Sequence, residues 1–314
     1  MSLLKELSQK LIFVVGKGGV GRSTVSSALA SAFAKENEHV LVVQWTLTDS
    51  LSPVYGLPPC GHQAVLLPPQ FMTMNFSSHE AIREYFVDHL KMKWLHSFLI
   101  ENKHVQKLLH AAPGISELFF LGRLLWLADL TQNNKGRCYD RVIVDTPAMG
   151  HGVSLFGIAQ TVARLGITGP LAQECERVTH LLQNPTKTAH VFVTLAEELP
   201  VEECMEFIPK ASHLLGHAPK MVFINQSANE HFFPDLALLE QPEFFRTHEN
   251  SSVFAQVFRR NFFESHMKAW AKEKNIATCS LPDVNLAHAN VSQERITHIL
   301  SEVLKKDSFQ FGAL

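Results

Sequence analysis

A glycine-rich segment at residues 16–24 has the composition of a loop that binds phosphate. It reads Gly-Lys-Gly-Gly-Val-Gly-Arg-Ser-Thr, comes directly after the apolar run Leu11–Val15, and is followed by a helical pattern. Glycines allow backbone N–H groups to turn inward around a phosphate, and the start of the following helix adds its dipole and its unpaired donors. The sequence therefore predicts a nucleotide-binding loop made by Gly16, Gly18, Gly19, Val20, Gly21, Arg22, Ser23 and Thr24.

Two oxygen-bearing side chains stand where a magnesium ion bound to the nucleotide would need ligands. Ser23 occupies the loop position whose hydroxyl binds Mg²⁺, and Asp145 ends a second apolar run. A carboxylate at the carboxyl end of a parallel strand beside a phosphate loop is well placed to bind Mg²⁺ or its waters. ATP and Mg²⁺ are therefore the expected ligands, with Ser23 and Asp145 as metal-binding residues and Asp145 as a candidate catalytic residue.

Arg22 stands where a phosphate loop of this kind usually carries a lysine. Lysine reaches the β- and γ-phosphates as a compact charge on a flexible stem, whereas arginine keeps the charge but brings a wider planar fork. We therefore expect this loop to retain nucleotide binding better than turnover.

Further segments accompany the loop, which carries an extra lysine, Lys17, near its start. One is Asp145-Thr-Pro-Ala-Met-Gly-His151, and the others are Ala112–Leu118, Val193–Val201 and Met221–Gln226. With this extra lysine the loop resembles that of the ParA, MinD, nitrogenase-iron-protein and arsenite-pump ATPases. Together the segments resemble the arsenite-pump (ArsA) and tail-anchored-protein-targeting ATPases, especially the bacterial members. The resemblance covers most of the chain and is weakest at Ser227–Asn250 and beyond Pro282.

The resemblance implies roles for three residues. In these families the extra lysine reaches across a dimer interface to the partner's nucleotide, so Lys17 implies an ATP-dependent dimer and is a candidate catalytic residue. Asn225 corresponds to an amide that contacts adenine, and an amide offers a base edge both a donor and an acceptor. His151 belongs to a segment that responds to the γ-phosphate. From the residues alone, a turn-forming role for Asn225 and a packing or helix-entry role for His151 remain open.

The segment after the second apolar run departs from the family's pattern. The family typically reads S-T-D-P-A-H-S-L-S, and this chain reads Gln44-Trp-Thr-Leu-Thr-Asp-Ser-Leu-Ser52. Aligning the final Ser-Leu-Ser places Thr46 at the family's catalytic aspartate, and a threonine hydroxyl cannot act as a carboxylate base at neutral pH. Asp49 is the candidate catalytic replacement, or else a solvated loop acid.

Because Arg22 and Thr46 are both altered, we expect slow hydrolysis or none. Together with the resemblance, this expectation leaves two functions open. One is a dimerising ATPase that acts as a nucleotide switch on a protein partner, and the other is a pseudo-ATPase that regulates or pairs with an intact paralogue. A homodimer and a heterodimer with such a paralogue both remain open.

These side chains can form one site only if the strands that precede them lie parallel in one sheet, with their carboxyl ends at the same edge. Short β-branched runs alternate with helical stretches, which predicts an α/β, P-loop NTPase fold with a mostly parallel central sheet flanked by helices. The chain reads as a single domain over 1–314 with a helical subdomain inserted at about 77–134. The expected strands are Leu11–Val15, Val40–Trp45, Arg141–Asp145, Val191–Leu195, Met221–Asn225 and Ile276–Ser280. The expected helices are Ser23–Glu36, His79–Leu109, Ile115–Leu130, Ser252–Lys274 and Ser292–Lys305.

The inserted helices carry two apolar sets at helical spacing. In the tail-anchored-targeting relatives the corresponding helices form a groove for a client's transmembrane segment, so the resemblance implies a hydrophobic client helix as a partner. Core packing and a dimer contact are the alternatives. The sets are Phe86, Leu90, Trp94, Leu95, Phe98 and Leu99, and Leu118, Phe119, Leu121, Leu124, Leu125 and Trp126.

The composition of the chain disfavours several other partners. A formal net charge of -2 leaves no overall positive field for nucleic acid. No stretch reaches the length of a membrane span and the N-terminus lacks the pattern of a signal peptide, so we expect a cytoplasmic protein with no integral membrane span. The cysteines are far apart and form no C-x-x-C pair, so no zinc is expected.

Overall fold

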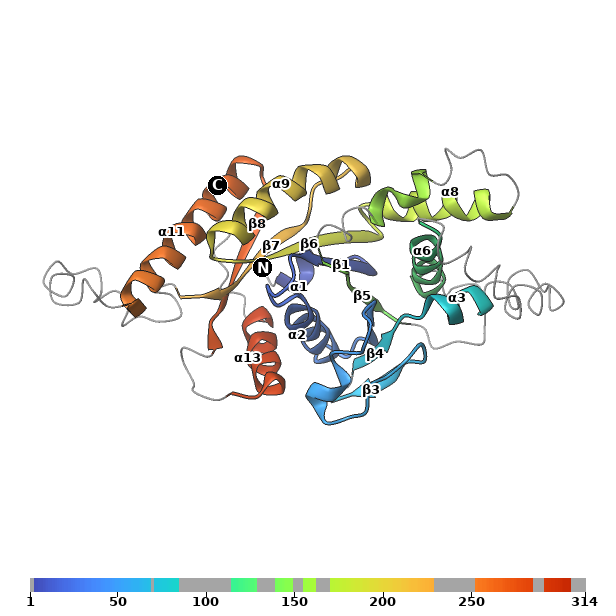
Figure 1. Cartoon of the computed structure of the whole chain (residues 1–314), viewed down its shortest axis with the longest axis horizontal. Helices are drawn as coiled ribbons and strands as arrows, with labels where there is room; N and C mark the ends of the chain where they lie inside the picture. The colour runs from blue at the N-terminus through green and yellow to red at the C-terminus, as the bar shows by residue number, and fades with distance from the viewer. Residues whose placement is uncertain are drawn as a thin grey trace, which may run out of the picture.

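The computed structural model describes residues 3–68, 71–84, 114–128, 139–148, 155–161, 170–228, 252–284 and 291–305. Within these residues a central sheet crosses the molecule (Figure 1). Its strands are β1 (Leu11–Gly16), β2 (Val40–Gln44), β3 (Val65–Leu67), β4 (Phe71–Asn75), β5 (Arg141–Asp145), β6 (Thr188–Leu195), β7 (Met221–Ser227) and β8 (Ala277–Pro282). They lie in the order β3-β4-β2-β5-β1-β6-β7-β8. Every pairing is parallel except that of β3 with β4, so the predicted fold class is confirmed.

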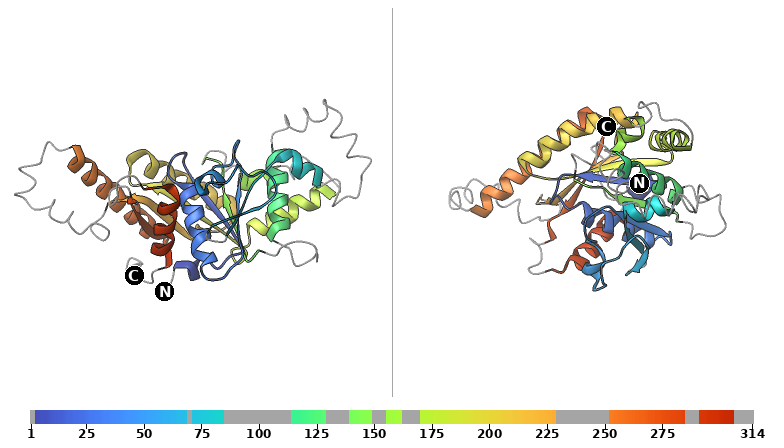
Figure 2. Two further views of the ribbon diagram at one scale, coloured as in Figure 1. Left: turned by 90° about the horizontal axis from the view of Figure 1, so that it is seen from below. Right: turned by 45° about the vertical axis from the view of Figure 1, so that its right-hand side comes forward.

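Helices cover both faces of the sheet because successive strand side chains point to opposite faces. Phe13 and Val144 belong to one apolar cluster, and Val14 and Ile143 to the other. The first cluster is closed by α3 (Ser78–Glu84), α6 (Ile115–Ala128), α8 (Pro170–Leu182), α9 (Glu198–Leu215) and α11 (Ser252–Glu273). The second is closed by α1 (Leu3–Glu6), α2 (Arg22–Ala34) and α13 (Gln293–Lys305). Figures 1 and 2 show α9 and α11 on one side of the sheet and α2 and α13 on the other.

The sheet order brings the predicted site residues to one edge. β1 lies between β5 and β6, with Val14 opposite Asp145 and Gly16 opposite Val193. Because loops that leave the carboxyl ends of neighbouring parallel strands meet at the same edge, ligands bind there in open α/β sheets. The glycine loop joins β1 to α2 at this edge.

All six predicted strands are confirmed, and β6 and β7 are longer than predicted. The sequence reading missed β3 and β4, since β3 has three residues and β4 reads Phe-Met-Thr-Met-Asn, with one β-branched side chain. It also missed α8 and α9, and α9 contains Pro200 and Pro209, which weaken a helical pattern. Helices α2, α6, α11 and α13 confirm four predictions.

Only part of the predicted insertion at 77–134 is described, so its extent stays a prediction. α3 forms the start of the predicted helix His79–Leu109, and the apolar set from Phe86 to Leu99 lies outside the described residues. The second apolar set lies on α6 and packs into the core. Trp126 is partly buried, and the buried members are Leu118, Phe119, Leu121, Leu124 and Leu125. Among the described segments, no helix is long and apolar enough to cross a membrane.

Candidate nucleotide site

Close contacts leave no room for a side chain at two glycines of the loop, Gly16 and Gly21. Gly19 and Gly21 have φ angles of 87° and 92°, in the region that glycine adopts without strain. A Cβ added at Gly21 would lie 2.3 Å from Nδ2 of Asn225, and one at Gly16 would lie 2.6 Å from the carbonyl oxygen of Val193. The loop therefore packs directly against β6 and β7.

Ser23 and Asp145, the predicted metal pair, are in contact. Oγ of Ser23 donates a hydrogen bond to Oδ2 of Asp145 at 2.6 Å. Asp145 is 2% exposed, and its Oδ1 has no hydrogen-bond partner within the described part of the chain. Burial raises the pKa of Asp145, against the hydrogen bond from Ser23 and the charge of Arg22. A buried carboxylate oxygen beside a hydroxyl is a donor set that fits Mg²⁺.

Arg22 is engaged by the protein backbone. Its Nη1 donates a hydrogen bond to the carbonyl oxygen of Thr146, the residue after β5. Thr146 is in turn fixed to β1, because its Oγ1 donates to the carbonyl oxygen of Val14 at 2.9 Å. A guanidinium group has five N–H donors, so this contact leaves others for a phosphate.

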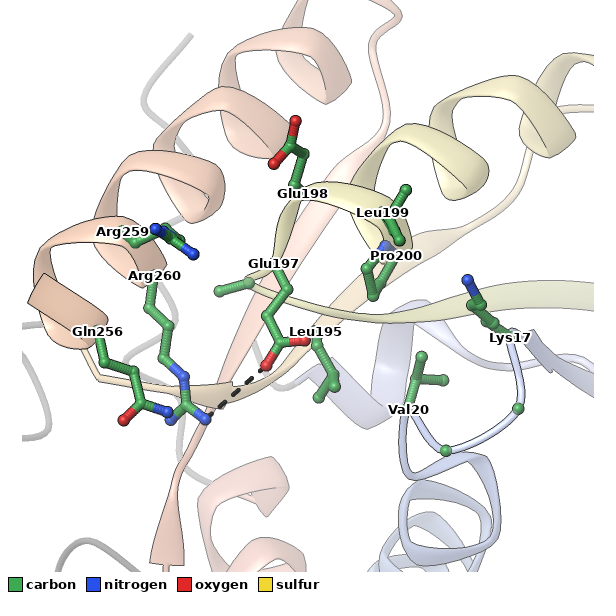
Figure 3. Close-up of a pocket in the computed structure, with 13 residues that line it drawn as sticks. Lys17, Val20, Leu195, Glu197, Glu198, Leu199, Pro200, Gln256, Arg259 and Arg260 are labelled. Atoms are coloured by element: carbon green, nitrogen blue, oxygen red, sulfur yellow. Dashed lines mark ion pairs between the residues drawn. The ribbon is translucent and has the colours of Figure 1, made fainter. Parts of the chain in front are cut away.

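Lys17 points toward α9. Its Nζ forms an ion pair with Oε1 of Glu203 at 2.7 Å, and the two side chains are 37% and 34% exposed. Lys17 also lines a cavity of about 810 Å³ that extends from the glycine loop to the start of α9 and to α11. Figure 3 shows Lys17 on one wall of this cavity and Arg260 on the opposite wall, where Arg260 faces Glu197 at 4.0 Å. The ammonium group therefore lies on the side of the loop that faces α9.

Asn225 lies against the loop. Its Nδ2 donates a hydrogen bond to the carbonyl oxygen of Val20 at 3.0 Å, and the residue is 5% exposed. The contact with adenine that the resemblance implies stays a prediction. Thr24, also predicted to bind nucleotide, accepts a hydrogen bond on Oγ1 from Nε2 of Gln293 at 2.6 Å, which joins the start of α2 to the start of α13.

Thr46 is held in place by Asn75, the last residue of β4. The backbone N–H and the hydroxyl of Thr46 lie 3.1 Å and 3.3 Å from Oδ1 of Asn75, and Nδ2 of Asn75 donates to the carbonyl oxygen of Thr46 at 3.1 Å. The hydroxyl also lies 2.9 Å from the carbonyl oxygen of Thr48. Thr46, which the sequence predicts to replace a catalytic aspartate, thus presents a hydroxyl that is tied to β4.

Asp49 is buried, so its interpretation as a solvated loop acid is wrong. It is 4% exposed and accepts hydrogen bonds from Nε2 of Gln44 at 2.6 Å and from the backbone N–H groups of Leu51 and Cys60, both at 2.9 Å. Burial alone would raise its pKa, but hydrogen bonds from Ser52, Cys60, Gln44 and Leu51 outweigh burial and lower the pKa to about 2. Both oxygens shape the loop, and a role in orienting water would require some of these bonds to break.

The sequence reading did not single out Asn75 or Glu203. Asn75 was not predicted because β4 was not predicted. The residues next to Asn75 in the sequence do not indicate a contact with Thr46. Glu203 lies two residues beyond the segment Val193–Val201, and a prediction of α9 would have placed it near the loop. His151 lies outside the described residues.

Comparisons with known proteins found similarity to ATPases. The model of the anion-transporting ATPase family (ArsA) matches residues 9–166. The ATPase BagA of Mycobacterium tuberculosis is 26% identical over 243 residues, which cover 74% of this chain and 70% of that protein. The ATPase get3 of Schizosaccharomyces japonicus is 27% identical over 201 residues, 62% of this chain and 59% of the relative. The ATPase ASNA1 homolog 2 of Paramecium tetraurelia is 31% identical over 159 residues, which cover 49% of this chain and 45% of that protein. Since the family match takes in half of the chain, with the glycine loop and Asp145, the chain belongs to the ArsA family of ATPases.

Proposed function

We propose that this chain binds ATP with Mg²⁺, dimerises in response to it, and acts as a nucleotide switch on a protein partner with slow hydrolysis. The observation that carries the proposal is the contact of Ser23 with the buried carboxylate of Asp145 beside the shaped glycine loop. A hydroxyl and a carboxylate at this place, with backbone N–H groups of the loop and of α2 next to them, match the needs of a nucleotide phosphate and its cation.

In this proposal each residue of the site has a distinct task. The loop from Gly16 to Gly21 surrounds the phosphates with N–H donors, and Arg22 offers its remaining donors to them. Ser23 and Asp145 hold Mg²⁺, which when bound offsets the negative charge of the phosphates. The Ser23 hydroxyl donates to Asp145 in this structure, so its lone pairs are available to the cation.

Slow hydrolysis follows from the groups around Thr46. No carboxylate stands at this position, and the Thr46 hydroxyl is tied to Asn75 and Thr48. Asp49 is committed to its own loop. These contacts support, as a second candidate function, a pseudo-ATPase that binds nucleotide and pairs with an intact paralogue, since such a partner would supply the missing carboxylate.

Dimerisation is supported by the direction of Lys17. Its ammonium group is partly exposed on the side of the loop that faces α9, and in this proposal a partner subunit approaches it there. In a dimer of the kind the resemblance implies, Lys17 would exchange Glu203 for the partner's nucleotide. The dimer partner in this proposal is a second copy of this chain or an intact paralogue. The protein on which the switch acts is a client with a hydrophobic helix.

Calorimetric titration with ATP and Mg²⁺ at millimolar concentration tests nucleotide binding. The parent chain should release heat and gain thermal stability. Asp145→Asn should lose the dependence of binding on Mg²⁺. Asp140→Asn is a matched control, because Asp140 is exposed, precedes β5 at the opposite edge of the sheet and binds the backbone N–H of His39 at 2.7 Å. A parent chain that shows neither heat nor a change in melting temperature would rule out the proposal.

A further inference from the structure

Glu264 is a buried acid that the proposed nucleotide chemistry does not use. It lies on α11 and is 2% exposed. Its Oε1 accepts hydrogen bonds from Oγ of Ser280 at 2.7 Å and from Nζ of Lys268 at 2.6 Å, and its Oε2 accepts one from Oγ of Ser227. Removing a carboxylate from water is costly unless hydrogen bonds replace its hydration. Glu264 thereby joins α11 to both β7 and β8.

The bond to Ser227 falls on an irregular part of β7. Ile224 pairs with Ser280 but Ser227 pairs with Pro282, so three steps along β7 match two along β8. Gln226, inside this bulge, has a φ angle of 54°. A bulge bends its strand and changes the direction of a side chain, and a positive φ is unfavourable for residues other than glycine. The conformation therefore needs support from its surroundings, and Glu264 supplies a hydrogen bond at its end.

Asn225 is the residue that precedes Gln226 in this bulge. Its amide donates to the carbonyl oxygen of Val20 and fills the space that Gly21 leaves by lacking a side chain. A continuous series of contacts thus runs from Glu264 through Ser227 and the bulge to Asn225 and the phosphate loop. It links a helix on one face of the sheet to the loop at its carboxyl edge.

We propose that Glu264 is a positioning residue of the nucleotide site, which acts by fixing the bulge that holds the Asn225 amide against the phosphate loop. This inference rests on the proposed nucleotide binding. A loop that is already fixed loses less conformational freedom when it closes on a ligand, so binding is tighter. Burial alone would raise the pKa of Glu264, but Lys268 and the hydroxyls of Ser227 and Ser280 outweigh burial and lower it. Glu264 is therefore a carboxylate at neutral pH and can accept all these hydrogen bonds.

A double-mutant cycle on ATP affinity in the presence of Mg²⁺ tests the inference. Glu264→Gln should weaken binding about tenfold, the order expected for one hydrogen bond to a charged group. In an Asn225→Ala background the same change should weaken binding by less than about twofold, because the series of contacts is already broken. Glu273→Gln makes the same chemical change at an exposed position of α11, where Glu273 pairs with Lys274 at 2.9 Å, and should leave affinity unchanged.

Hydrogen exchange of residues 16–24 in the nucleotide-free protein separates this inference from the proposed function. Both Glu264→Gln and Ser227→Ala should speed exchange in this loop, while Glu273→Gln should not. If the parent chain binds no ATP, the proposed function fails and the exchange rates still decide the role of Glu264. Unchanged exchange in both variants would overturn the inference, and so would an equal loss of affinity with and without the Asn225 amide.

Discussion

The ammonium group of Lys17 lies 2.7 Å from the carboxylate of Glu203, on the side of the phosphate loop that faces α9. Lys17 therefore has a partner within its own chain, and the proposed ATP-dependent dimerisation would require it to exchange that partner for a nucleotide. Lys17→Ala should leave ATP affinity of the monomer within about twofold and reduce ATP-dependent association, since the cross-dimer charge is lost. Light scattering with and without a non-hydrolysable ATP analogue measures association.

Glu203→Gln should have the opposite effect on association. Exposed ion pairs are worth about 0.2–1 kcal/mol, so releasing Lys17 should strengthen association by up to about fivefold per subunit. Lys210→Ala is the control, because Lys210 forms an exposed pair with Glu206 at 2.6 Å on the same helix. A Lys17→Ala protein that associates as well as the parent would exclude the cross-dimer contact, and weaker association of Glu203→Gln would show that Glu203 assists Lys17.

Hydrolysis should respond to restoring the two altered positions. Thr46→Asp with Arg22→Lys supplies a carboxylate for the attacking water and a compact phosphate-binding charge, both of which act mainly in the transition state. We expect kcat to rise by about tenfold or more while nucleotide affinity changes little. Phosphate release under single-turnover conditions measures this rate.

Asn75 complicates this experiment, because it fixes the backbone of Thr46 on both sides. A triple variant with Asn75→Ala tests whether a new aspartate must move. Brisk turnover by the parent chain would show that Arg22 and Thr46 are not catalytic defects.

Substitution of Gly21 should disturb the loop far more than substitution of Gly18. At Gly21 the φ angle is 92° and a Cβ would meet the Asn225 amide at 2.3 Å, whereas a Cβ at Gly18 would have no atom of the described residues within 4 Å. Gly21→Ala should therefore weaken ATP binding by about tenfold or more, through strain and loss of the hydrogen bond to Val20. Gly18→Ala should stay within about threefold. Calorimetric titration compares the two, and equal losses would mean that the loop changes shape when it binds nucleotide.

The sequence predicted the sheet and the main contact of the site because both depend on local patterns. Apolar runs placed β1 and β5, and their carboxyl ends carry Gly16 and Asp145, so Ser23 and Asp145 were expected to meet. The Thr46 loop was not predictable in the same way. Its shape depends on Asn75 from a strand with a weak pattern, and on Asp49, whose burial follows from hydrogen bonds within the folded loop.

The role of Glu264 could not be predicted either, because its contacts also depend on the folded arrangement of distant segments. Its partners Ser227 and Ser280 come from two different strands, and the bulge that brings Ser227 within reach is visible only in the register of those strands. From the sequence alone, an acid on a long helix such as α11 is expected to be a solvated side chain.

Binding of Mg²⁺ should weaken on acidification at a higher pH than an ordinary aspartate would require. Burial raises the pKa of Asp145, so a proton competes with the cation for its carboxylate at a pH above the usual aspartate range. ATP is titrated with and without Mg²⁺ from pH 8 to about pH 4. As the pH falls, the Mg²⁺-dependent part of the ATP affinity should decline before the affinity measured without Mg²⁺. Asp145→Asn should lack this decline. If the variant shows the same pH profile as the parent chain, the titrating group is not Asp145.

Asp49 should make the folded state more stable at neutral pH than in acid. Its pKa is about 2 in the folded protein and 3.8 in the reference state, so its contribution is complete above about pH 4 and is lost as the pH falls toward 2. Asp49→Asn should lower the free energy of unfolding at pH 7 by about 2 kcal/mol, because its NH₂ group would face the N–H donors of Leu51 or Cys60. Urea denaturation at pH 7 and pH 3 measures both effects. The exposed control Asp140→Asn should follow the parent at pH 7, and if Asp49→Asn is as stable as the parent there, Asp49 does not shape its loop.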